Sequence, residues 1–147
     1  MEKNEFYRVF KIKRIFNNSS TQSKRELIGI INDTTYENGL KCDLNFIDTS
    51  KITDMSALFE SSRFNGDISK WDVSNVRNMN EMFCDSEFNG DISKWNVSNV
   101  YTMEDMFTKS EFDDIRILSK WSLQKGVNKH NIFNDSPLNG KRFKHLK

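Results

Sequence analysis

The stretch that decides the fold is FNGDISKW, which occupies residues 64–71 and recurs unchanged at residues 88–95, 24 residues further along the chain. An identical octapeptide at a fixed spacing indicates an internal repeat, which has to be recognised before any single element is assigned. The repeat also explains the composition, because most of the 12 Phe, 3 Trp and 6 Met residues fall at a few repeated positions. Stacked units of this kind bury one continuous core that no unit could form alone.

Outward from that stretch, the spacing of 24 residues extends in both directions. A more divergent first copy begins near Leu40, and after Phe112 the spacing grows to 26, which predicts a two-residue insertion around residues 115–118. The register therefore gives four copies and the start of a fifth at Leu138, with the four copies at residues 40–63, 64–87, 88–111 and 112–137.

Each copy combines two periodicities. Ile68, Trp71 and Val73 have the apolar spacing L-x-x-L-x-L of a leucine-rich repeat, and the alternation around Trp71 and Val73 predicts a short strand at about residues 70–74. Residues 76–83 place apolar side chains at helical spacing, which predicts one or two helical turns. Asn65-Gly66 supplies turn residues that tolerate positive φ. Strand, turn, helix and turn would make one coil, with the strands stacked into a parallel sheet.

The string WDVSNVRNMNEMFCDSEFNGDISKW at residues 71–95 closely resembles the repeats of BspA-like leucine-rich repeat proteins. The resemblance covers about residues 40–140, since the Trp, Met-Phe and Phe-Asn-Gly signatures recur in phase. It implies an α/β fold: a right-handed leucine-rich-repeat solenoid of about four coils with a short parallel sheet. It also implies a role in binding other macromolecules, typically proteins at bacterial or parasite surfaces.

The ends of the chain are predicted to cap this array. Residues 24–38 fit a helix that begins with the capping box Ser23-Lys24-Arg25-Glu26 and stops at Asn38-Gly39. Residues 5–16 fit either a strand or a helix, and we favour a strand or extended arm packed on the cap. We expect one structural domain with three parts: arm and cap at 1–39, repeats at 40–137, and a partial repeat with a basic, frayed tail at 138–147.

Charge is divided unevenly along the 147 residues. The net charge of +1 combines +5 in residues 1–25, +4 in residues 138–147 and −8 in the segment between them. Apolar runs are far shorter than the roughly 20 residues needed to span a bilayer, and the first 16 residues lack the apolar stretch of a signal peptide. We therefore expect no membrane span and a cytoplasmic location, with the cell surface possible only if a leader had been removed.

The sequence contains few residues suited to chemistry. His130 and His145 have no ligand partner at a metal-binding spacing, and Cys42 and Cys84 fall in loops of different coils. Asn-Gly-Asp recurs once per coil and so follows the repeat instead of forming a phosphate loop. We expect a protein that is not an enzyme and that uses no cofactor and no metal.

The predicted partner-binding surface is the exposed face of the strands. Stacking the copies would align a lysine column beside a column that changes from acid to amide: Phe46, Asp48, Lys70, Asp72, Lys94, Asn96, Lys120 and Ser122. Such columns can recognise a protein partner through charge-assisted hydrogen bonds. They can equally be solvated residues copied by duplication, and Phe46 can be either an interface anchor or a side chain packed under the arm.

These features favour a non-enzymatic protein-binding module with a protein partner. The alternative is an intracellular inhibitor, encoded by a phage or mobile element, that blocks a host nucleic-acid-binding or defence protein with its acidic repeat body. Basic residues among aromatics in the arm are typical of nucleic-acid binding as well as of a solvated basic face. Because the acidic body would repel phosphates, nucleic acid is not the expected partner.

Overall fold

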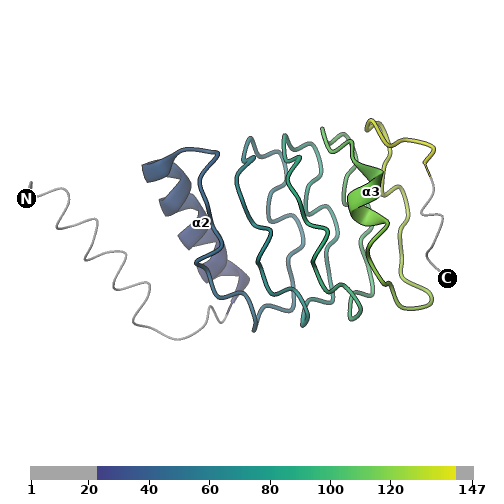
Figure 1. Cartoon of the computed structure of the whole chain (residues 1–147), viewed down its shortest axis with the longest axis horizontal. Helices are drawn as coiled ribbons and strands as arrows, with labels where there is room; N and C mark the ends of the chain where they lie inside the picture. Colours follow the sequence, from purple (N-terminus) through teal and green to yellow (C-terminus); the bar gives the residue numbers. More distant parts are fainter. Residues whose placement is uncertain (1–22, 142–147) are drawn as a thin grey trace, which may run out of the picture.

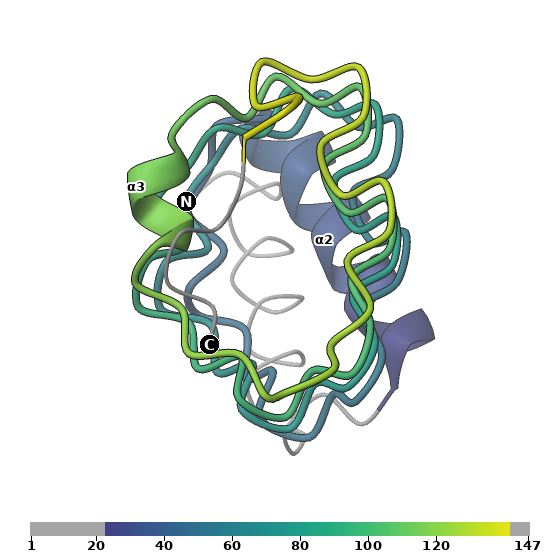
Figure 2. The ribbon, with the colours of Figure 1, turned by 90° about the vertical axis from the view of Figure 1, so that its right-hand side faces the viewer.

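The chain winds into successive coils that stack side by side along one axis. The computed structural model describes residues 23–141, and helix α2 (Lys24–Asn38) lies at the N-terminal end of the row of coils, as Figure 1 shows. Along the stacking axis the coils superimpose closely (Figure 2). The predicted arm at residues 5–16 and the tail at residues 142–147 lie outside the described residues.

Helix α2 confirms the predicted cap, with the predicted bounds. Ser23 is the N-cap, and its Oγ accepts a hydrogen bond from the backbone N–H of Glu26. The helix ends at Asn38 and is capped by Gly39, whose φ of 85° lies in the region that glycine adopts without a steric penalty. Leu27 and Ile31, on one face of the helix, are buried in the core.

A polar contact also fixes α2 against the first coil. Lys24 Nζ donates to Ser56 Oγ at 2.7 Å and lies 3.8 Å from Asp54 Oδ1. The helix thus covers the apolar end of the array, as a terminal cap must when a stack of repeats would otherwise expose its core.

The repeat register is confirmed by the pairing of backbones between neighbouring coils. Parallel bridges join Asp54 to Asn78, Asn78 to Thr102, and Thr102 to Asn128. These partners are 24, 24 and 26 residues apart, so the insertion falls in the last of the three intervals.

The predicted α/β fold class is wrong. Between residues 23 and 141 the structure contains helices α2 and α3 (Ile115–Leu118) and no strand, so the predicted solenoid with a short parallel sheet is not formed. Parallel pairing is limited to isolated bridges, and none of them falls in the predicted strand at residues 70–74.

Side-chain hydrogen bonds to the local backbone explain why the strand does not form. Asp67 Oδ1 accepts from the N–H of Ser69 at 2.9 Å, and Asp72 Oδ1 accepts from the N–H of Ser74 at 3.0 Å. Such Asx turns bend the chain and use backbone groups that a sheet would have paired. The polar–apolar–polar alternation that indicated a strand is therefore a series of turns, each with its central apolar residue buried.

The predicted helical turn at residues 76–83 is also wrong, because this segment is a run of tight turns. Two non-glycine residues in each copy have positive φ, among them Glu81 at 56° and Asp85 at 54°. This left-handed backbone costs roughly 1–2 kcal/mol per non-glycine residue. It directs every second N–H to the next coil: those of Met79, Glu81, Phe83 and Asp85 each donate to a carbonyl of the next coil at 2.8–2.9 Å.

Aromatic side chains stack through the middle of the array. Phe59, Phe83, Phe107 and Phe133 form one column, with ring centroids 5.6, 5.5 and 6.0 Å apart. Each Trp donates its indole N–H to a carbonyl of the preceding coil, as Trp95 does to Ile68 at 3.1 Å. The repeated aromatics therefore join one coil to the next as well as filling the core.

Gly66 and Gly90 are needed for close approach, not for the positive φ that the sequence suggested. Neither residue has a positive φ. A Cβ at Gly66 would overlap the carbonyl oxygen of Cys42 in the preceding coil, and at Gly90 it would lie 2.8 Å from the ring of Phe88.

The insertion forms helix α3, which replaces the Asn-Gly-Asp corner in the last full coil. Asp114 is its N-cap and accepts from the N–H of Arg116 at 3.0 Å. Figure 2 shows α3 lying outside the common outline of the coils, on the side of the array away from α2. The last coil is thus extended at one corner and otherwise follows the copies before it.

Candidate binding surface

All eight residues of the predicted surface are exposed and follow the same side of the stack. Hydrogen bonds join the segments that carry them: Lys70 N–H donates to Asn45 Oδ1 at 2.7 Å, and Asn99 Nδ2 donates to Ser74 O at 2.7 Å. The columns are therefore present although the strands are not. Phe46, which takes the place of the lysine in the first coil, is 39% exposed.

The acid-to-amide column closes turns in three of the four coils. Asp48 Oδ1 accepts from the N–H of Ser50, and Asp72 and Asn96 each accept from both the N–H and the hydroxyl of the serine two residues later. The hydrogen bonds from Ser50 hold the pKa of Asp48 below its usual value. These side chains are thus part of the fold, while the Ser122 hydroxyl at the same position in the last coil accepts no corresponding hydrogen bond.

The lysine column is the more available half of the surface. Lys70, Lys94 and Lys120 form no ion pair with any residue of the described segment. These lysines nonetheless act on a neighbouring carboxylate, Asp91. Its pKa is lowered first by hydrogen bonds from Ser93 and then by electrostatic attraction to Lys120 and Lys94. The ammonium groups can therefore donate to a carboxylate of a partner.

Three residues on the same side were missed by the sequence interpretation. Arg77, Tyr101 and Lys125 are exposed, and Tyr101 shows 60% of its surface to solvent. We call this the basic side, defined by residues 46–53, 70–77, 94–101 and 120–127. Its charge by coil is 0, +1, +1 and +2, and this count could have identified Arg77 and Lys125 from the sequence, although not the uncharged Tyr101.

The opposite charge gathers in the run of tight turns. We call this the acidic side, defined by residues 54–63, 78–87, 102–111 and 128–137, with a combined charge of −6. Cys84 lies there, and its thiol pKa is raised first by burial and then by the carboxylates of Glu60 and Glu81, followed by those of Asp105 and Asp85. A thiol kept protonated in this way is a poor nucleophile.

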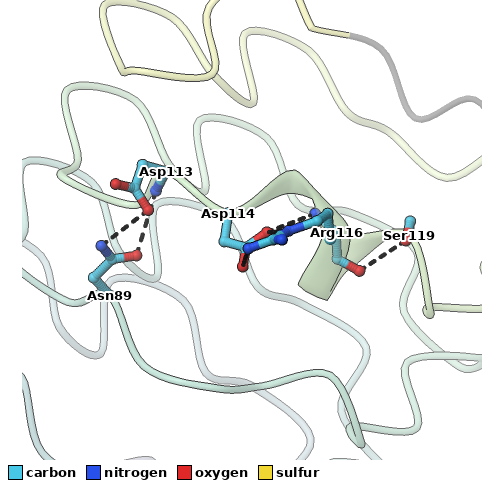
Figure 3. Close-up of polar contacts among 5 residues, drawn as sticks. All are labelled: Asn89, Asp113, Asp114, Arg116 and Ser119. Atoms are coloured by element: carbon cyan, nitrogen blue, oxygen red, sulfur yellow. Dashed lines mark hydrogen bonds and ion pairs between the residues drawn. The ribbon is translucent and has the colours of Figure 1, made fainter.

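The corner that contains α3 adds a third set of polar contacts, drawn in Figure 3. Asn89 and Asp113 bridge two coils through a pair of hydrogen bonds, at 3.1 and 3.3 Å. Arg116 pairs with both carboxylate oxygens of Asp114 at 2.9 Å, and this hydrogen-bonded partner lowers the pKa of Asp114. Ser119 Oγ donates to the Arg116 carbonyl. The polar groups of this irregular corner are therefore hydrogen-bonded to each other and to the preceding coil.

Neither a metal centre nor a disulfide is formed by the part of the chain that the structure covers. Within residues 23–141 no three His, Cys, Asp or Glu side chains are grouped to hold a metal ion. Cys42 and Cys84 are both free thiols. The helices in this range are also too short or too polar to cross a membrane.

Comparison with known proteins identifies a family. No curated protein and no solved structure matches the sequence. The family described as "Mycoplasma protein of unknown function, DUF285" matches residues 29–145, which include most of α2 and all four coils. This match extends over well more than half of the chain, and the chain therefore belongs to the DUF285 family.

Proposed function

We propose that this chain is a non-enzymatic protein-binding module that presents its basic side to a protein partner. The supporting observation is the row of exposed lysines, Lys70, Lys94 and Lys120, carried by coils that are bonded to each other through their backbones. A surface that is rigid before binding loses little conformational entropy on docking. The resemblance of the repeats to BspA-like proteins supports the same role.

The test is charge reversal of the column. Lys70→Glu, Lys94→Glu and Lys120→Glu are combined in one variant, and a matched control reverses three exposed lysines elsewhere, Lys41, Lys109 and Lys141. A partner is captured from cells that carry the gene, identified by mass spectrometry and titrated with each protein. We expect the column variant to lose about tenfold or more in affinity and the control to change little. If wild type and the column variant bound the partner with equal affinity, the proposal that the partner binds the basic side would be rejected.

A second function is favoured by the separation of charge. In the alternative, the protein is an intracellular inhibitor from a phage or mobile element, and its acidic side occupies the nucleic-acid or effector site of a host protein. The net charge of −6 on one side of the coils supports it, because an acidic surface attracts a basic site and speeds association. Reversal of Glu60, Glu81 and Asp85 to Lys distinguishes the two functions, since it should abolish inhibition without weakening a partner bound on the basic side.

A further inference from the structure

The basic side changes in composition from one end of the stack to the other. In the first two coils its central column carries a carboxylate, Asp48 or Asp72, whereas in the last two coils the same position is Asn96 or Ser122. Residues 94–101 and 120–127 contain three lysines and no acid. The C-terminal half of the basic side is therefore cationic without an internal counter-charge.

An exposed aromatic residue lies in the same half. Tyr101 is joined to the coil before it and to the coil after it: its N–H donates to Arg77 O, and its carbonyl accepts from the N–H of Asn128, both at 2.9 Å. Gln124 Nε2 donates to Val100 O at 2.8 Å, which holds the segment bearing Lys125 beside that bearing Tyr101. Tyr101 thus lies on a firmly bonded backbone with cationic residues in the neighbouring coils.

From this arrangement we infer that Arg77, Lys94, Tyr101, Lys120 and Lys125 form a docking surface for an acidic polypeptide segment. The inference rests on the proposed function and names the partner chemistry for one end of the basic side. Carboxylates of the segment accept hydrogen bonds from the cationic groups, and Tyr101 packs against an apolar residue between them. Aromatic and arginine side chains are the types that most often dominate binding energy at an interface.

Charge elsewhere on the molecule favours a short acidic peptide over nucleic acid. The acidic side carries −6, and residues 64–69, 88–93 and 112–119, which precede the basic side in each coil, carry −1 each. A short peptide confined to the cationic patch comes near Asp91, which lies within electrostatic reach of Lys94 and Lys120, and stays clear of the acidic side. A nucleic acid that extends past the patch brings its phosphates against them, which costs binding energy.

The experiment titrates the full chain with a fluorescently labelled peptide of Glu and Asp with one central Leu, and measures anisotropy. We expect saturable binding that weakens by about tenfold for the combined variant Arg77→Glu, Lys125→Glu. We expect a loss of about fivefold for Tyr101→Ala, which keeps the charge and so reports the aromatic contact alone. Lys109→Glu, an exposed charge reversal on the acidic side, is the control and should change affinity by less than about twofold. Circular dichroism checks that each variant stays folded.

Four outcomes would overturn the inference. The first is no binding of the peptide to the wild-type chain. The second is an equal loss for Lys109→Glu, since attraction by net charge would then suffice. The third is tighter binding of a single-stranded oligonucleotide than of the peptide at both low and high salt, which would assign the patch to nucleic acid. If a captured protein partner is lost with the lysine-column variant but retained by Arg77→Glu, Lys125→Glu, the proposed function stands and this inference fails.

Discussion

Asp and Asn side chains determine the path of the backbone at the corners of each coil. In the second copy the corners follow Asp67, Asp72 and Asn78, and each side-chain oxygen accepts from the N–H two residues later at 2.9–3.0 Å. Residues with short polar side chains compete in this way with regular secondary structure. These hydrogen bonds are local and cost little free energy. Turns therefore form in place of a strand where an apolar residue lies between two such polar residues and must point into the core.

Gly66 gives a residue-scale prediction. Gly66→Ala should lower the free energy of unfolding by about 1–3 kcal/mol, because the new Cβ would overlap the carbonyl oxygen of Cys42 and the ring of Phe64. Gly29→Ala is the matched control. No atom lies within 4 Å of a Cβ built there, and alanine favours a helix by about 1 kcal/mol, so this variant should be stabilised. Urea denaturation measures both, and equal stability of Gly66→Ala and wild type would contradict the close approach.

At the scale of elements, the two helices have different origins. Helix α2 follows from local signals, since Ser23, the apolar face with Leu27 and Ile31, and Gly39 all agree on its position. Helix α3 has only four residues and occurs where the repeat has lost its glycine. Without that glycine the chain cannot pass closely over the preceding coil, and it takes a helical turn outside the outline of the stack (Figure 2).

Replacing FDDIRILSKW at residues 112–121 with FNGDISKW tests this account of α3. The restored glycine would lie over Gly90 as Gly90 lies over Gly66, so we expect a folded protein whose free energy of unfolding changes by less than about 1 kcal/mol. The same replacement with alanine in place of that glycine is the control and should be less stable by about 1–3 kcal/mol. If the two replacements unfold at the same urea concentration, glycine is not the reason for the corner.

At the scale of the whole molecule, the four coils behave as one body because each is bonded to the next by backbone, side chain and ring contacts. The run of tight turns donates four N–H groups from each of the first three coils to the coil that follows. Positive φ at two non-glycine residues per coil is unfavourable locally and is retained because it directs these donors along the stack. The same stacking aligns the residues of the basic side and of the acidic side into separate surfaces.

Acid should weaken the whole array through its Asx turns. The neighbouring Asn45 amide and the hydrogen bond from the N–H of Ser69 lower the pKa of Asp67, and hydrogen bonds from Ser93 lower the pKa of Asp91. Because the folded pKa values lie below the unfolded value of about 3.9, this stability is fully present above about pH 4 and is lost as the pH falls through the folded values. Unfolding monitored by circular dichroism should therefore show declining stability below about pH 4.

A double variant separates these two turns from other acid effects. Asp67→Asn with Asp91→Asn keeps an oxygen acceptor, as Asn96 does in its own turn, but cannot be protonated. It should remain folded near neutral pH and lose stability less steeply in acid than wild type. An unchanged acid slope would mean that the two turns do not carry the effect.

The sequence by itself determined the repeat, its register, the insertion, the capping helix and the apolar residues that fill the core. It also placed the lysine column on the surface, because repeats aligned in register, with the two-residue insertion taken into account, put equivalent residues next to each other whatever the backbone does between them. Tertiary structure decided the rest. Whether alternating residues form a strand or a turn depends on where backbone groups find partners, and here side chains and the adjacent coil supply them. The need for Gly66, the left-handed residues and the place of Tyr101 beside Arg77 arise only when one coil lies on another.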